Sequence, residues 1–215
     1  IQAIEKLNIQ LNKQVLDNQQ GTLLSKKDLF IQGNSVNNKD GSIVSGNNTN
    51  ITLEQGFNNQ LGQVQSQGLL VLNAQKLDNQ QTQNDELGLK ASNIHISTNE
   101  LLNHQGVIQA SELLKLIPAE KLNNQSGLIS ANELTIGGSP KNNLAIDNKK
   151  GLLATTSQLR LWAENLTGDG DVISGGNSEI QLKNAFVLDE NATIKAQDSL
   201  IFSSEQRIDN RGFIY

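Results

Sequence analysis

Apolar and polar residues alternate along almost the whole chain with a period of two. Between residues 16 and 31, Leu23, Leu29 and Ile31 fall on one side of this alternation, and the small residue Ser25 lies between them. A period of two indicates strands rather than helices, because successive side chains of a strand point to opposite faces. The same order recurs in Ile108, Ala110, Leu114 and Leu116, and again in Leu153, Thr155, Leu159 and Leu161.

The alternation is organised into a repeat of about 21 residues. When each copy is aligned on its first apolar residue, the ten copies are spaced by 20, 21, 20, 24, 21, 24, 20, 21 and 21 residues. A glycine usually follows five residues after this opening residue. A fixed period of this length indicates a solenoid. The opening residues are Leu16, Val36, Phe57, Leu77, Leu101, Leu122, Ile146, Leu166, Val187 and Ile208.

One period has room for two or three short strands separated by turns. Leucine-rich repeats have a similar length, but they place one short strand before a helical or irregular arc, whereas two strands follow each glycine here. Stacked coils would pair each strand in parallel with its counterpart one coil away, and right-handed winding is the rule for such crossovers. We therefore expect an all-β, right-handed parallel β-helix of about ten coils. It would form a single segment over residues 1–215, with a partial first coil at residues 1–15.

An asparagine two residues after the opening residue recurs in eight of the ten copies, and Gly168 and Asp189 interrupt it. Two roles are open. Stacked asparagines can hydrogen-bond along the axis as a ladder, or each asparagine can adopt the left-handed backbone of a tight corner. Because the residue keeps its place in copy after copy, we predict a ladder. Its members are Asn18, Asn38, Asn59, Asn79, Asn103, Asn124, Asn148 and Asn210.

Two copies are enlarged, by a polar stretch at residues 80–86 and by GGSPKNN at residues 137–143. Solenoids accept such insertions as loops outside the stack. Strand alternation also directs the aromatic residues Phe30 and Trp162 outward. These features are candidate contact sites, although tolerated loops and scattered apolar residues are also normal on a solenoid surface.

Composition narrows the range of functions. Aromatic residues make up only 3% of the chain and cysteine is absent, so leucine and isoleucine must form the core, and thiolate chemistry is excluded. The net charge of -5 argues against nucleic-acid binding, which requires clustered lysine and arginine. No apolar stretch approaches the roughly 20 residues that span a bilayer. We expect no cofactor, no nucleic-acid partner and no membrane insertion by this segment.

The sequence offers only weak candidates for a catalytic site or a metal-binding site. Asp169 and Asp171, one coil before Asp189 and Glu190, could converge as the carboxylates of a glycan-cleaving β-helix or hold calcium. Gly-Asp-Gly-Asp is also an ordinary turn sequence, and we favour that interpretation. The two histidines, His95 and His104, are expected on different faces, which disfavours a metal pair. We therefore do not expect an enzyme.

The stretches LDNQQGTLLSKKDLFI, LNNQSGLISANELTI and IDNRGFI resemble the filamentous haemagglutinin repeat, and the resemblance extends over residues 16–215. Such repeats build the shafts of two-partner secretion exoproteins, including filamentous adhesins and CdiA-type effectors of contact-dependent growth inhibition. The resemblance implies secretion through an outer-membrane transporter and a place at the bacterial cell surface. The segment would then present an adhesive or toxin-delivery activity. Alternatively, the shaft itself would contact a receptor on a target cell. Both ends of the chain fall in mid-pattern, so we expect a piece of a longer filament.

Overall fold

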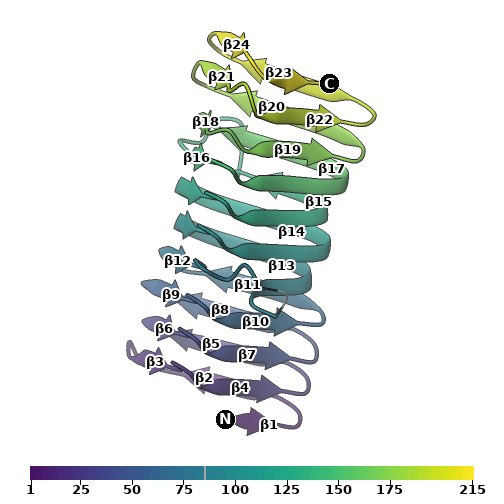
Figure 1. The fold of residues 1–215 in the computed structure, drawn as a ribbon. Helices are drawn as coiled ribbons and strands as arrows, with labels where there is room; N and C mark the ends of the chain where they lie inside the picture. Colours follow the sequence, from purple (N-terminus) through teal and green to yellow (C-terminus); the bar gives the residue numbers. More distant parts are fainter. Residues whose placement is uncertain (85) are drawn as a thin grey trace.

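The chain folds into a stack of parallel strands that rises from the N-terminus to the C-terminus as a rod. The structure is a computed structural model that describes residues 1–84 and 86–215, and Figure 1 shows the coils lying one above another. About ten coils follow one another at intervals of about 21 residues, and within the described ranges every regular element is a strand. The predicted all-β parallel solenoid is confirmed.

Each coil contributes strands to three faces. The first face contains β1 (Gln2–Ala3), β4 (Thr22–Ser25), β7 (Ser42–Ser45), β10 (Gln63–Ser66), β19 (Asp171–Ser174), β22 (Thr193–Ala196) and β25 (Phe213–Ile214). The second face contains β2 (Leu7–Gln10), β5 (Leu29–Gly33), β8 (Thr49–Leu53), β11 (Leu69–Asn73), β20 (Asn177–Leu182) and β23 (Leu200–Ser204). The third face contains β3 (Val15–Asp17), β6 (Ser35–Asn37), β9 (Gly56–Asn58), β12 (Lys76–Asp78), β16 (Ala145–Asp147), β18 (Asn165–Thr167), β21 (Phe186–Leu188) and β24 (Ile208–Asn210).

Four long strands in the middle of the rod bend from face to face without a break. β13 (Gly88–Leu102) pairs with β10, β11 and β12 in turn, so it crosses all three faces. β14 (Val107–Asn123) follows the same course one coil later, while β15 (Leu128–Ile136) and β17 (Leu152–Ala163) cover the first two faces.

The core is a set of columns in which equivalent inward residues of successive coils lie directly over one another. In one column Leu23 pairs in register with Ile43, and Ile43 pairs with Val64; all three are at most 1% exposed. The inward residues expected from the alternation, including Leu114 and Leu159, are buried. Burying such a side chain contributes about 1.5–3 kcal/mol, and repetition of this burial over many coils holds the stack together.

Small inward residues mark the bend between the first and second faces. The hydroxyl of Ser45 donates to Ser66 at 3.2 Å, and that of Ser66 donates to Thr49 at 2.6 Å. Farther up the rod, Thr155 donates to Ser174 at 3.0 Å. A small side chain lets two strands converge here, and its hydroxyl is satisfied by a neighbouring coil, as a buried polar group requires.

The predicted position of the ninth opening residue is wrong by one. Phe186, and not Val187, pairs with Ile208, and Val187 is 43% exposed whereas Phe186 is 3% exposed. The ring of Phe186 meets that of Phe202 edge-on at a centroid distance of 5.0 Å. The larger aromatic side chain buries more apolar surface than valine would, and this decides the local register.

Replacing Leu114 with alanine should lower the free energy of unfolding by about 2–5 kcal/mol, because the fully buried side chain would leave a cavity. The exposed Gln109, in the same strand β14, is the matched control, and Gln109→Ala should change stability by less than about 0.5 kcal/mol. Urea unfolding followed by circular dichroism measures both variants. Equal effects of the two substitutions would contradict the inward placement of Leu114.

Candidate functional site: the asparagine ladder and the outer surface

Seven of the eight predicted asparagines form one line along the corner between the third and first faces. In every step, the side-chain Nδ2 donates to the Oδ1 of the asparagine one coil later, and all seven side chains are at most 6% exposed. The donor–acceptor distances are 2.7 Å for Asn18–Asn38 and Asn38–Asn59, and 2.8 Å for Asn59–Asn79, Asn79–Asn103, Asn103–Asn124 and Asn124–Asn148.

The same amides are also bonded to the backbone of two coils. Nδ2 of Asn38 donates to the carbonyl oxygen of Gly41 in its own coil at 3.2 Å and to that of Gln63 in the next coil at 3.1 Å. An amide buried this deeply would be costly without partners. The bonds therefore tie each corner both to itself and to the coil above it.

In six of the seven ladder coils a glycine lies three residues after the asparagine, and there the stacked side chain leaves no room for a Cβ. A Cβ on Gly41 would lie 2.7 Å from Oδ1 of Asn38 and 2.3 Å from the carbonyl oxygen of Asn18. In the fourth copy Thr82 takes the glycine position, and its hydroxyl donates to the Asn79 carbonyl at 3.1 Å and accepts from the Val107 amide at 3.0 Å. A threonine hydroxyl can therefore supply bonds at this corner in the enlarged copy.

The left-handed residue of the corner is not the asparagine, contrary to the alternative role that its turn preference suggested. It lies two positions farther on, and its φ is between 50° and 58° in all seven coils. Most of these residues carry side chains for which the left-handed region is unfavourable. They are Gln20, Asp40, Leu61, Gln81, Gln105, Ser126 and Lys150.

The line of asparagines ends at Asn148, whose Nδ2 donates to the Asp171 carbonyl at 3.1 Å. The next two ladder positions hold Gly168 and Leu188, since the register places Leu188, and not Asp189, opposite Asn210. Within the described residues Asn210 has no asparagine partner, and its Oδ1 accepts from the Gly212 amide at 3.1 Å. The structure thus brings together Asn18 to Asn148 and leaves Asn210 apart.

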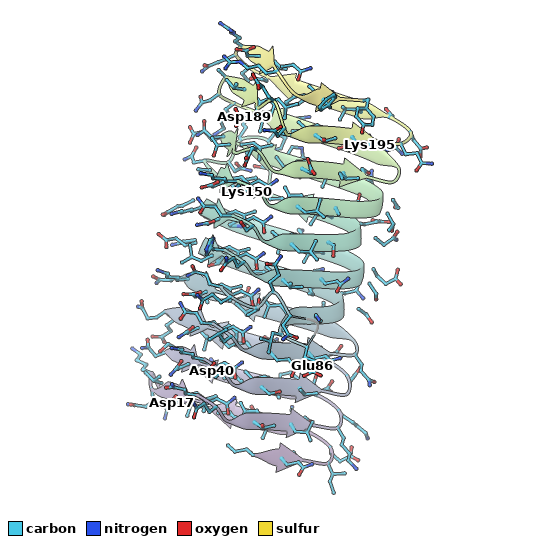
Figure 2. All side chains as sticks on the ribbon, in the orientation of Figure 1. Asp17, Asp40, Glu86, Lys150, Asp189 and Lys195 are labelled. Atoms are coloured by element: carbon cyan, nitrogen blue, oxygen red, sulfur yellow. The ribbon has the colours of Figure 1, made fainter. Side chains whose placement is uncertain are left out.

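A second polar column runs beside the ladder on the outside of the third face, and the sequence reasoning missed it. Nδ2 of Asn37 donates to Asp17 at 3.0 Å, and Nδ2 of Asn58 donates to Asn37 at 3.2 Å. Each of these side chains also accepts from the backbone N–H two residues later. The signal was present as a second recurring Asp or Asn, one residue before six of the seven stacked asparagines, with Leu102 before Asn103 as the exception. Figure 2 shows Asp17, Asp40, Lys150 and Asp189 on this side of the rod.

Phe30 and Trp162 do not form a common patch. From Phe30 the strand register leads through Asn50, Val71, His95, Lys115 and Thr135 to Arg160, two residues before Trp162. Six coil steps correspond to about 29 Å. Both aromatic side chains are only partly exposed: Lys6 covers the ring of Phe30 at 4.3 Å, and Nε1 of Trp162 is buried without a partner among the described residues.

Hydrogen bonds hold both enlarged turns, one within its own loop and the other to a neighbouring coil. In the loop at residues 80–86, of which residue 85 lies outside the described residues, Oδ1 of Asn84 accepts from the Glu86 amide at 3.2 Å. In the loop at residues 137–143, Nδ2 of Asn142 donates to the carbonyl of Trp162 at 2.8 Å. The second loop is thereby attached to the strand that carries the tryptophan.

The carboxylates of Asp169 and Asp171, the candidates for a catalytic or calcium site, accept hydrogen bonds from the backbone. Oδ1 of Asp169 accepts from the Lys150 amide and Oδ1 of Asp171 accepts from the Thr193 amide, each at 2.9 Å. Each bond joins neighbouring coils and favours the turn interpretation. Across residues 1–84 and 86–215, no group of three or more histidine, aspartate or glutamate side chains is placed to hold a metal ion. The same residues contain no helix long and apolar enough to cross a membrane.

Exposed ion pairs contribute little to this surface. The hydrogen bond from Arg211, together with the nearby Arg207, holds the pKa of the Asp209 carboxyl below its usual value. A hydrogen bond to Glu5 raises the pKa of Lys27. Pairs of this kind in full contact with solvent are weak, so cohesion between coils depends on the core and the ladder.

Replacing Asn103 with alanine should lower the free energy of unfolding by about 2–4 kcal/mol, because the buried Nδ2 of Asn79 and Oδ1 of Asn124 both lose a partner. The exposed Asn99 in the same strand region is the control, and Asn99→Ala should be nearly neutral. Thermal unfolding of the two variants provides the measurement. A neutral Asn103→Ala would show that the ladder does not stabilise the fold.

Replacing Leu61 with asparagine should raise the free energy of unfolding by about 1 kcal/mol. Leu61 is an exposed residue with φ near 53°, and asparagine tolerates this left-handed conformation better than leucine does. Gln60→Asn, at the preceding position, whose φ is not left-handed, should give no such gain. A destabilised Leu61→Asn variant in urea unfolding would contradict the strain assigned to this corner.

Comparison with known families agrees with these observations. The model of the haemagglutinin repeat matches residues 6–60, 47–162 and 154–212. No curated protein and no solved structure gives a significant match. Because the three matched stretches together cover nearly all of the chain and coincide with the coils described above, the chain belongs to the haemagglutinin repeat family.

Proposed function

We propose that this chain is a shaft segment of a secreted, cell-surface filament that holds an adhesive or toxin-delivery activity away from the cell. The observation that carries the proposal is the unbroken line of asparagine bonds from Asn18 to Asn148, which joins seven coils through one repeated contact. Each coil adds about 4.8 Å of length. Because each repeated coil with its asparagine bond only lengthens and stiffens the rod, this structure is well matched to the role of a shaft.

Family membership supports the route by which such a shaft reaches the surface. The haemagglutinin repeat is a structural and adhesin family, and its members belong to two-partner secretion exoproteins that are secreted or surface-associated. We propose an outer-membrane transporter as the partner during export and the bacterial surface as the final location. The absence of cysteine fits export of an unfolded chain, since a disulfide would hinder its passage.

We propose no catalytic role for the segment. The carboxylates of Asp169 and Asp171, the best candidates for glycan cleavage, each accept a backbone hydrogen bond from an adjacent coil. A growth-inhibition effector and a filamentous adhesin would use the same shaft in the same way. The segment itself therefore supports presentation, and the presented activity belongs to the rest of the filament.

Duplicating residues 38–78 tests the shaft. The insert adds two coils in register. In the duplicated chain Asp78 is followed directly by Asn38, and because Asp78 occupies the same position of its coil as Asn37, this new junction is equivalent to the natural one between Asn37 and Asn38. The rod should lengthen by about 10 Å while keeping its cooperative unfolding. Small-angle scattering measures the length. In the parent exoprotein, antibody labelling of intact cells should still detect the presented end, provided that the transporter is present.

Duplicating residues 38–68 is the control for this experiment. This insert adds one and a half coils, so inward and outward residues would no longer match across the junction, and the stack should lose its cooperative unfolding. A correctly folded 38–78 duplication that abolished presentation would contradict a role based on length alone.

A further inference from the structure

In the described part of the chain, the strands of the third face fail to pair at one step of the rod. β18 and β21 lie next to each other in the stack (Figure 1). β18 pairs with β16 and β21 pairs with β24, but no strand pairing joins β18 to β21. At each step from β3 to β18 the strands of this face do pair in parallel. The break between β18 and β21 is termed the seam.

The corner beside the seam also lacks the bonds that join the earlier coils. In seven coils the backbone N–H of the ladder asparagine donates to a carbonyl oxygen of the next coil, as Asn148 does to Thr167 at 2.8 Å. Gly168 takes this position one coil later, and its N–H has no partner among the described residues. Without a side chain, Gly168 cannot continue the asparagine ladder either. The seam therefore runs along the third face and through its corner with the first face.

Two side-chain hydrogen bonds, one at each end of the seam, hold it closed. Nδ2 of Asn184, just before β21, donates to Oδ1 of Asn165 at the start of β18, at 2.9 Å. At the other end, the N–H of Thr193 donates to Oδ1 of Asp171 at 2.9 Å. Each such bond replaces a bond to water and adds little to stability by itself. The seam is therefore held less firmly than a step with paired strands.

The other two faces remain continuous across the same step. β19 pairs with β22 on the first face, and β20 pairs with β23 on the second. At the bend between these faces, the N–H of Gln197 donates to the Ser174 carbonyl at 3.1 Å, and that of Asp198 donates to the Gly176 carbonyl at 3.2 Å. In a three-sided coil this bend lies opposite the third face. It therefore provides a line about which the two coils can tilt apart.

Water can stabilise the opened seam. A groove of about 500 Å³ lies outside it, and Gly168 and Asp169 of one coil and Asp189 of the next are among its lining residues. A backbone N–H without a partner is costly when enclosed, and solvent from the groove can bond to that of Gly168. At an earlier step the same movement would break bonds instead. The buried side chains of Leu166 and Phe186 oppose opening, so the seam is closed at rest.

We propose that the seam is an opening point built into the rod, at which the third face parts between β18 and β21 while the other two faces stay paired. Opening bends the rod toward the edge between the first and second faces without separating the coils. This flexibility goes beyond the function of a shaft, because a uniformly stiff rod would extend equally far.

Thiol labelling tests the proposal, because the chain has no cysteine and a single buried one reports local opening. Leu166→Cys places the thiol inside the seam, whereas Leu122→Cys and Val36→Cys place it in the same inward column at paired steps. Leu166→Cys should react about tenfold or more faster than both controls. Val36 lies closer to an end of this chain than Leu166 does, so labelling of Val36→Cys at an equal or higher rate would overturn the proposal in favour of fraying. An equal rate for Leu122→Cys would also overturn it.

Asn184→Ala in the Leu166→Cys chain is the second test, because it removes the bond to Asn165 that helps to close the seam. Labelling should become about threefold or more faster. Asn58→Ala in the same chain is the matched control: it removes the bond from Nδ2 of Asn58 to Asn37 at a paired step and should change labelling by less than about twofold. Equal acceleration by both substitutions would mean that the whole stack unfolds and would overturn the proposal, as would no acceleration by Asn184→Ala. Small-angle scattering on these chains tests the shaft separately, through the length of the rod.

Discussion

The hydrogen bond that passes from one asparagine amide to the next determines the geometry of the whole corner. A primary amide can donate along the axis and accept from the opposite direction, so identical side chains can be stacked without leaving a buried polar atom unpaired. The stacked side chain occupies the space in which a Cβ of the residue three positions later would lie, as at Gly41. The turn then closes only if the residue between them adopts a left-handed conformation, as Leu61 does. Asparagine, left-handed residue and glycine therefore form one unit in six of the seven ladder coils, and Thr82 takes the glycine position in the coil of Asn79.

The asparagine bonds persist where the chain departs from its repeat. They span the enlarged turn at residues 80–86, which lies at this corner, through Asn79–Asn103, and the one at residues 137–143 through Asn124–Asn148, each at 2.8 Å. Beyond Asn148, at the positions of Gly168 and Leu188, no side-chain amide continues the line. There Phe186 and Phe202 pack edge-on. In these C-terminal coils apolar packing therefore supplies part of the cohesion that the asparagine hydrogen bonds supply in the earlier coils.

The outer surface follows a different rule from the core. Outward residues of neighbouring coils are in register, so a side chain is partly covered by the residues above and below it, as Phe30 is by Lys6 and its neighbours. Single outward aromatic residues are therefore less available than strand alternation suggests.

The sequence by itself determined the period, the strand class, the inward placement of residues such as Leu114 and the recurring position of the asparagines. These follow from spacing alone, because equivalent positions of a solenoid lie over one another whatever their detailed contacts. Only the tertiary structure decided that Phe186 rather than Val187 faces inward, that the left-handed residue follows the asparagine, that Asn210 stands apart, and that Phe30 and Trp162 lie six coils apart. Each of these depends on a shift of one residue or on the distance between side chains of different coils. That distance is set when the coils pack against each other, so it cannot be predicted from the spacing of residues within one copy of the repeat.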